Sequence, residues 1–130
     1  MARQFTLGKT ERLKSRKKIE ALFSTGQRFT SVPFLVYYRV HNDAEPAALQ
    51  AGFSASKKNF KRAVDRNRAK RIIREVYRLQ NAPLKNMIKT GIKSLDIFII
   101  YTGKELPVYT EVSVKFGQVI QKLTEVYGKA

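Results

Sequence analysis

The chain has 130 residues and a formal net charge of +16, from 26 Lys and Arg against 10 Asp and Glu. Its length suits one domain with a modest core, and 43% of its residues are hydrophobic. Cysteine is absent, which excludes disulfides and thiolate metal sites. No apolar run could span a bilayer, and the N-terminal residues lack a signal core. We therefore expect a single cytoplasmic domain, residues 1–130, that avoids membranes and binds an anionic partner.

The hydrophobic pattern predicts six elements after an irregular N-terminal arm, residues 1–14. Helices are expected where apolar residues recur every three or four positions, and strands where branched and aromatic residues cluster. In chain order these are a helix over 16–25, strands over 34–40 and 49–56, a helix over 64–79, a strand over 96–102 and a helix from Thr110 to Gly128. This order predicts an α+β single-domain α-β-β-α-β-α sandwich, with helices packed on a small, mostly antiparallel sheet.

The connections carry their own signals. Turn residues at 41–46 predict that the strand 49–56 returns antiparallel to the strand before it. The residues Asn81, Ala82 and Pro83 are expected to end the second helix. The lysine-rich stretch from Pro83 to Leu95 leaves room for a short helical turn.

The segment from Lys57 to Arg78 carries the strongest functional signal. It holds ten Lys or Arg against two acids, Asp65 and Glu75. At about 100° per residue, one arc of roughly 120° is apolar and comprises Ala69, Ile72, Ile73, Val76 and Leu79. The opposite arc of about 100° comprises Asn67, Lys70, Arg71, Arg74 and Arg78. A solvated helix face normally mixes charges of both signs, and a membrane-surface helix favours bulky apolar residues, so this helix is typical of nucleic-acid binding.

The sequence offers little for protein-based catalysis. Its single histidine, His41, falls in a predicted turn, where a surface position is the favoured interpretation. One histidine and no cysteine exclude nucleophilic triads and histidine-built zinc sites. The carboxylates are scattered, and Asp65 fits a helix start better than a metal site. We therefore expect no catalytic residue and no metal ligand in this chain.

Aromatic residues suggest a surface for single-stranded RNA. Candidates lie on the first helix and the first two strands, at Phe23, Phe34, Tyr37, Tyr38 and Phe53. Exposed aromatics beside basic residues stack on unpaired bases, although each of these residues also suits a core. Alternation along a strand places Tyr37 and Tyr38 on opposite faces, so one of this pair at most lines a given groove.

The residues 63–71, AVDRNRAKR, resemble the Arg-Asn-Arg signature helix of the bacterial ribonuclease P protein subunit. The preceding residues 52–58, GFSASKK, resemble the strand that leads into that helix. An RLKS sequence at 12–15, followed by a helix, also fits, so the resemblance covers about residues 10–127. One departure lies before the helix. Many members have Gly-Asn there, whereas this chain has residues 60–62, Phe-Lys-Arg, and is one residue longer.

The resemblance implies a small basic protein that joins a catalytic RNA, as a monomer in a 1:1 complex, to remove the 5′ leader from precursor tRNA. It also implies a left-handed β-α-β crossover, and Mg²⁺ held mainly by the RNA. Residues expected to bind the catalytic RNA are Arg62, Arg66, Asn67, Arg68, Lys70, Arg71 and Arg74. Residues expected to bind the leader are Phe23, Tyr37, Phe53, Ser56, Lys57 and Lys58.

Two other functions fit the composition. A ribosomal-type or RNA-chaperone protein would also be a basic α+β domain without an enzyme role, and only the Arg-Asn-Arg motif and its position after the lysine-rich strand end argue against it. A DNA-binding module would place a short helix before its recognition helix. Here a strand is predicted in that place.

Overall fold

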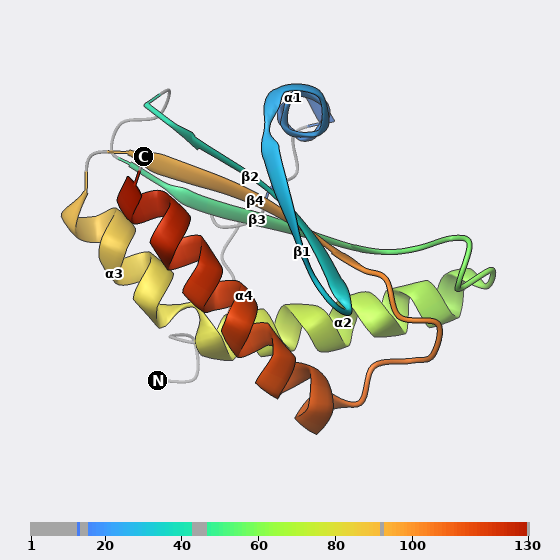
Figure 1. The fold of residues 1–130 in the computed structure, drawn as a ribbon. Coiled ribbons are helices and arrows are strands. Elements are labelled where there is room, and N and C mark those ends of the chain that lie inside the picture. The colour runs from blue at the N-terminus through green and yellow to red at the C-terminus, as the bar shows by residue number, and fades with distance from the viewer. Residues whose placement is uncertain (1–12, 14–15, 43–46, 92, 130) are drawn as a thin grey trace.

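The structure is a computed structural model, and it describes residues 13, 16–42, 47–91 and 93–129. Its elements are α1 (Arg16–Thr25), β1 (Gln27–Ser31), β2 (Phe34–His41), β3 (Leu49–Ala55), α2 (Ala63–Gln80), α3 (Ala82–Thr90), β4 (Ser94–Tyr101) and α4 (Tyr109–Lys129). Figure 1 shows one sheet with α1 on one face and α2, α3 and α4 on the other. The α+β class is confirmed. The predicted N-terminal arm lies outside the described residues, except for Leu13.

The strand order is β1-β2-β4-β3, with two antiparallel pairs and one parallel pair, β3 with β4. The sheet is therefore mostly antiparallel, as predicted. The expectation that β3 returns beside β2 is wrong, because β4 lies between them. The physical reason is burial: six of the eight residues of β4 are buried, and a strand this apolar takes a central position. A parallel neighbour also requires a long crossover, which α2 and α3 supply.

The predicted order lacks β1, and where α3 lies it allowed only a short helical turn. β1 is five residues long and mostly polar, QRFTS, so it lacks a strand signal, and its pairing with β2 forms it. α2 ends at Gln80, close to the predicted end, but Pro83 then lies in the first turn of α3. Proline is tolerated there because the first N–H groups of a helix have no partner inside it.

Register divides the sheet into two faces, since paired residues of neighbouring strands point the same way. The face that carries Val36 and Ile99 packs against α2, α3 and α4, and both side chains are completely buried. Phe34 belongs to this face and contacts Phe116 of α4, with ring centroids 5.3 Å apart. It is therefore a core residue. We call the opposite face, which carries Tyr37, the open face.

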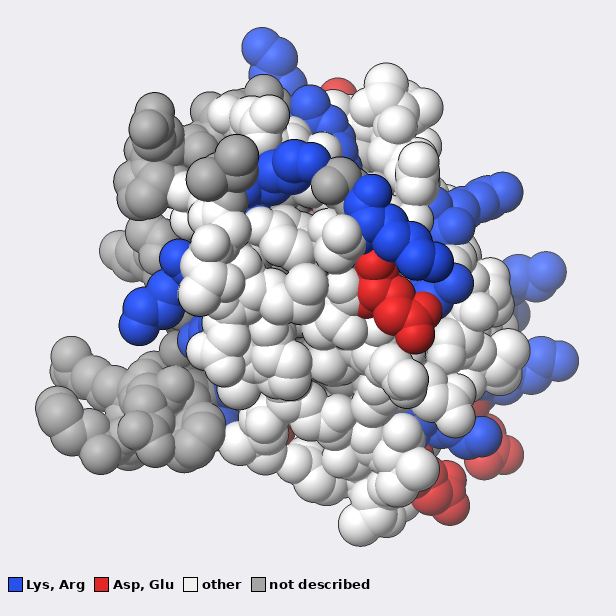
Figure 2. Space-filling view, turned by 60° about the vertical axis from the view of Figure 1, so that its left-hand side comes forward, with Lys and Arg blue, Asp and Glu red and all other residues white. Residues whose placement is uncertain are grey.

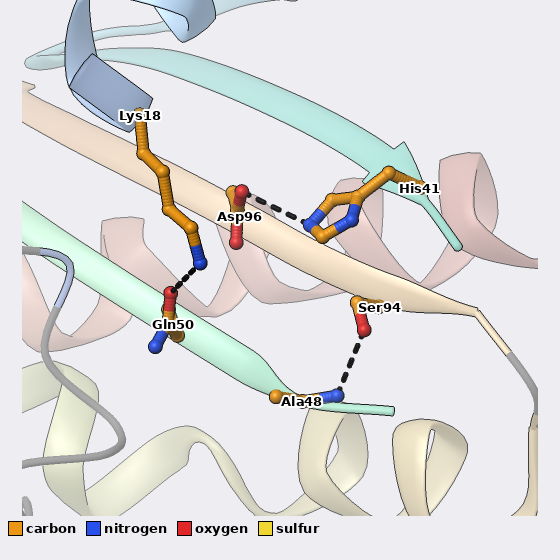
Figure 3. A network of polar contacts seen from close by, with 6 residues as sticks. All are labelled: Lys18, His41, Ala48, Gln50, Ser94 and Asp96. Atoms are coloured by element: carbon orange, nitrogen blue, oxygen red, sulfur yellow. Dashed lines mark hydrogen bonds and ion pairs between the residues drawn. The ribbon is translucent and has the colours of Figure 1, made fainter. Parts of the chain in front are cut away.

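The prediction that His41 is a surface residue in a turn is wrong. β2 extends to His41, which is buried, and its Nε2 lies 3.0 Å from Oδ2 of Asp96 in β4 (Figure 3). Beside this pair, Lys18 of α1 donates to Gln50 of β3 at 3.2 Å, and Ser94 accepts from the Ala48 backbone N–H at 2.9 Å. Burial of a carboxylate is costly unless a partner compensates it. Asp96 is the one acid in the otherwise apolar strand β4, and its contact with His41 explains why this histidine is buried.

We predict that Gly52→Ala destabilises the fold and Gly117→Ala does not. A Cβ at Gly52 would lie 2.7 Å from Cδ2 of Phe98, so the ring must move, and the expected loss is about 1–3 kcal/mol. At Gly117 in α4 the nearest atom would be 3.8 Å away, and alanine should stabilise the helix by about 0.5–1 kcal/mol. Denaturant unfolding measures both. Equal changes in the two variants would contradict the close packing of Phe98 on β3.

Candidate nucleic-acid interface

α1 lies on the open face, and we call the strip of this face beside α1 the groove. Lys18 near the start of α1 reaches Gln50 on β3, and Gly26 at its end leads into β1, so the helix runs from the β3 side of the sheet toward β1. Figure 1 shows α1 nearly end-on above the strands. Beyond α1, the register aligns one further row of open-face side chains from β3 to β1, which we call the floor strip: Ser54, Ile100, Leu35 and Thr30. None of these four is buried.

An aromatic cluster lies where α1 meets this strip. Phe23 of α1 is 45% exposed, and its ring lies 4.8 Å from Tyr37 and 5.2 Å from Phe98, edge to face in both contacts. Arg28 of β1 donates from Nη1 to the Tyr37 hydroxyl at 3.4 Å. Gly52 leaves space for the Phe98 ring over β3. The cluster therefore joins three aromatic rings to one guanidinium group on a partly exposed surface.

The structure brings Phe23 and Tyr37 together, as predicted, but not Phe53. Phe53 points to the opposite face, where its ring lies 5.3 Å from Tyr77 of α2 and packs against the core. Phe98 takes the place expected for Phe53. The alternation of side chains along a strand could have indicated this position for Phe98. Its neighbours Ile97 and Ile99 are buried in the core, so Phe98 points to the open face.

The basic face of α2 lies where the helical period predicted, but the buried face is rotated from the predicted apolar arc. Leu79, expected on that arc, is 44% exposed, and Tyr77 is buried instead. Ala69, Ile73 and Val76 are buried against the core. The exposed side carries a row of three arginines and one asparagine, at Asn67, Arg68, Arg71 and Arg74, with Lys70 partly exposed beside them. We call the four exposed residues, Asn67, Arg68, Arg71 and Arg74, the α2 row. They place three cations along about two turns of helix, a spacing that suits the phosphates of a polyanion.

Acidic residues near α2 pair with cations outside that row. Asp65 lies in the first turn of α2, with Oδ2 at 3.7 Å from Nε of the exposed Arg62. Glu75 accepts from Nε of Arg78 at 3.0 Å and also pairs with Nη2 of that arginine. The α2 row itself therefore keeps its charge. Within the described residues, no three His, Asp or Glu side chains gather so as to hold a metal ion.

The loop between β3 and α2 is closely held. Its exposed lysines, Lys57 and Lys58, lie in a turn closed by the Phe60 N–H, which donates to the Ser56 carbonyl at 2.9 Å. Phe60 is buried, and its ring stacks on Tyr101 at 6.1 Å and 25°. Because Ser56 directly follows β3, the two lysines lie at the end of the sheet beside the floor strip, close to the start of α2.

Arg66 differs from the α2 row. Its side chain is partly buried, and Nη1 donates to the backbone carbonyls of Phe60 at 2.8 Å and Lys61 at 2.9 Å. The sequence pattern gave it the same role as Arg68. The structure instead shows its guanidinium bound to the loop before the helix.

Tyr101 of β4 holds the loop between β3 and α2 through its ring contact with Phe60, and the pKa of its hydroxyl is raised. Its hydroxyl donates to the Glu105 carbonyl at 2.9 Å. Burial, together with the negative charges of Glu105 and Glu111, raises the pKa of Tyr101 above its ordinary value of 10.0. Each of these causes disfavours the phenolate.

Charge is unevenly distributed over the surface. Figure 2 shows a face on which uncharged residues fill most of the described area, while Lys and Arg lie mainly toward its upper part and margins. A polyanion would gain little on the centre of this face. The α2 row and the two lysines of the loop are better suited to phosphates.

Comparison with known proteins gives one consistent family. Residues 7–130 match the family model described as Ribonuclease P. A curated Ribonuclease P protein component from Porphyromonas gingivalis is 37% identical over 103 residues, which cover 79% of this chain and 75% of the relative. Another from Legionella pneumophila is 30% identical over 126 residues, covering 96% of this chain and 99% of the relative.

Solved structures agree on the fold. The RNase P protein of Staphylococcus aureus superposes with a TM-score of 0.66 at 24% identity, covering 88% of this chain and 96% of that one. The RNase P protein of Thermotoga maritima gives a TM-score of 0.65 at 23% identity, covering 86% and 96%. None of the helices among the described residues combines the length and hydropathy needed to cross a bilayer.

We predict that Tyr101→Phe makes stability less sensitive to alkaline pH. The folded state raises the pKa of Tyr101, so it holds the phenolic proton more tightly than the unfolded chain does. The wild type should therefore lose stability as pH rises above the ordinary tyrosine value of 10.0, and Tyr101→Phe should lose less. Thermal midpoints measured from about pH 8.5 to about pH 11.5 test this difference. The range is chosen because tyrosine pKa values in proteins spread by roughly one unit around their mean. The exposed Tyr109→Phe is the control and should follow the wild type. Parallel curves for wild type and Tyr101→Phe would contradict the prediction.

Proposed function

Because this chain belongs to the ribonuclease P protein family, we propose that its open-face groove grips the 5′ leader of precursor tRNA while the α2 row binds the catalytic RNA. The protein component of ribonuclease P is part of a ribonucleoprotein endoribonuclease that processes tRNA 5′ ends together with an RNA subunit. The observation that carries the finer proposal is the aromatic cluster of Phe23, Tyr37 and Phe98, with Arg28 at one side and the loop lysines at the end of the sheet.

The groove suits an unpaired strand of variable sequence. Base stacking on aromatic rings tolerates any base and contributes about 1–3 kcal/mol per base. Phe23 offers an exposed ring, and the partly exposed Ile100 and Leu35 offer an apolar floor. Arg28 at one side, and Lys57 and Lys58 at the end of the sheet, supply positive charge for the phosphates. These features support a partner that differs in sequence from one precursor to the next.

The α2 row suits a structured RNA backbone. Arginine donates through a planar fork that matches phosphate oxygens, and the buried opposite side of α2 holds the helix in place. The row is turned outward from the core, so it can meet a large partner without rearrangement of the fold. We place the catalytic RNA here, in a complex with one copy of this chain.

We further propose that the RNA supplies the catalytic groups and holds most of the Mg²⁺. Phosphodiester hydrolysis needs charge stabilisation at the attacking and leaving oxygens, which clustered carboxylates with metal ions can provide. Three carboxylates are already paired, Asp65 with Arg62, Glu75 with Arg78 and Asp96 with His41. These side chains therefore do not fit a protein-held Mg²⁺ site, and the protein contributes binding and orientation.

The central experiment is cleavage of precursor tRNA by the cognate catalytic RNA at low Mg²⁺, with and without this protein. The protein should raise the rate, because neutralising phosphates reduces the need for cations. An unchanged rate at every protein concentration would reject the proposal and favour a ribosomal-type or RNA-chaperone role.

We predict that Arg68→Ala weakens binding to the catalytic RNA with little change in thermal midpoint, because the side chain is exposed. Loss of one phosphate contact should reduce the slope of log K against log salt by roughly 0.7–0.9. Filter binding over a salt series measures it. The control is Lys122→Ala, which removes an exposed cation from α4. An equal effect in both variants would mean that net charge, rather than the α2 row, sets affinity.

We predict that Tyr37→Ala lowers holoenzyme affinity for precursor tRNA but not for mature tRNA, since only the precursor carries a leader. Loss of one stacking partner should cost about 1–3 kcal/mol, or roughly 5- to 150-fold. The control is Tyr38→Ala, the next residue, which points to the helix-covered face and contacts Phe29. Equal losses of affinity for both tRNAs in Tyr37→Ala would contradict the placement of the leader in the groove.

A further inference from the structure

The two arginines of the Arg-Asn-Arg motif are placed differently. Two helical positions separate Arg66 and Arg68, which is about 200° around the axis, so they cannot face the same way. Arg68 is exposed, whereas Arg66 is partly buried and directed back toward the N-terminal end of α2. An equivalent role for both arginines is therefore not supported by their geometry.

Arg66 completes the attachment of the loop before α2. Its Nη1 donates to the carbonyls of Phe60 and Lys61, at 2.8 and 2.9 Å. Arg62, at the start of α2, provides no side-chain cap to the helix. The loop carbonyls thus have a charged donor within hydrogen-bonding distance, and bonds of this kind are stronger than those between neutral groups.

The same loop is attached from its other side to the end of β4. Asn59 Nδ2 donates to the carbonyl of Thr102 at 3.0 Å and to that of Gly103 at 3.3 Å. The buried Phe60 ring fills the space between these attachments and stacks on Tyr101. A loop held by Asn59, Phe60 and Arg66 keeps one position relative to both the sheet and α2.

We propose that Arg66 is a positioning residue of the leader site rather than a member of the α2 row. By holding the carbonyls of Phe60 and Lys61, it fixes the turn that presents Lys57 and Lys58 at the end of the floor strip. Its contribution to RNA binding then passes through these two lysines. This inference rests on the proposed function of the groove as the leader site.

The test compares Arg66→Ala with Arg68→Ala in the assembled holoenzyme. Arg66→Ala should weaken precursor tRNA binding by roughly three- to tenfold, the scale of two exposed ion pairs, and leave mature tRNA binding unchanged. Its salt slope for the catalytic RNA should match the wild type, whereas that of Arg68→Ala should fall. A loss of catalytic-RNA affinity and of salt slope in Arg66→Ala as large as in Arg68→Ala would overturn the inference.

A double-mutant cycle isolates the route through the lysines. In a chain that already carries Lys57→Ala and Lys58→Ala, adding Arg66→Ala should cost no further precursor affinity. A full additional loss would mean that Arg66 acts independently of them. Asn59→Ala supplies a second variant that removes no charge and frees the same turn from β4. It should reproduce the selective loss even if Arg66→Ala does not fold, and unchanged precursor affinity in Asn59→Ala would also contradict the inference.

Failure here is distinguishable from failure of the proposed function. If Tyr37→Ala is selective for precursor tRNA and Arg66→Ala is not, the groove remains the leader site and only the role of Arg66 falls. If neither variant distinguishes the two tRNAs, the leader does not lie in the groove.

Discussion

The parallel pairing of β3 with β4 determines where α2 and the loop before it lie. Two adjacent parallel strands need a crossover, and here the crossover consists of α2 and α3 on one face of the sheet. α2 must therefore start at the end of the sheet where β3 stops. The loop that joins them reaches the end of β4, so its lysines, the floor strip and the start of α2 come together at one end of the sheet.

The two faces of the sheet differ in how deeply their side chains are buried. The face under α2, α3 and α4 holds fully buried side chains such as Val36 and Ile99, which supply the hydrophobic stabilisation. Among the residues that the structure describes, α1 covers the open face only in part, which leaves aromatic and apolar groups of that face partly exposed. A chain of net charge +16 repels itself, and three of its ten acids pair locally with Arg62, Arg78 and His41. The exposed row on α2 is left to be neutralised by a partner.

Sequence predicts what depends on local periodicity. The helix over 16–25 and the polarity of α2 follow from spacing alone, because a helix brings residues three and four apart onto one side. Strand order does not follow, since pairing between distant segments has no local signal. For this reason the sequence suggests that β3 lies beside β2, and it does not indicate the polar strand β1. The errors at Phe53 and His41 have the same origin, because which face of a strand is buried, and which residue lies opposite, depends on the neighbouring strands.

The close attachment of the loop also has a mechanical consequence. Under the proposed function, the leader and the catalytic RNA bind surfaces that belong to different elements, the open face and α2. Those surfaces are joined through a short loop that is hydrogen-bonded to β4 on one side and to Arg66 on the other. Its buried Phe60 further limits its motion. Little entropy is then lost in orienting one RNA relative to the other, because the fold has already fixed the distance between their binding surfaces.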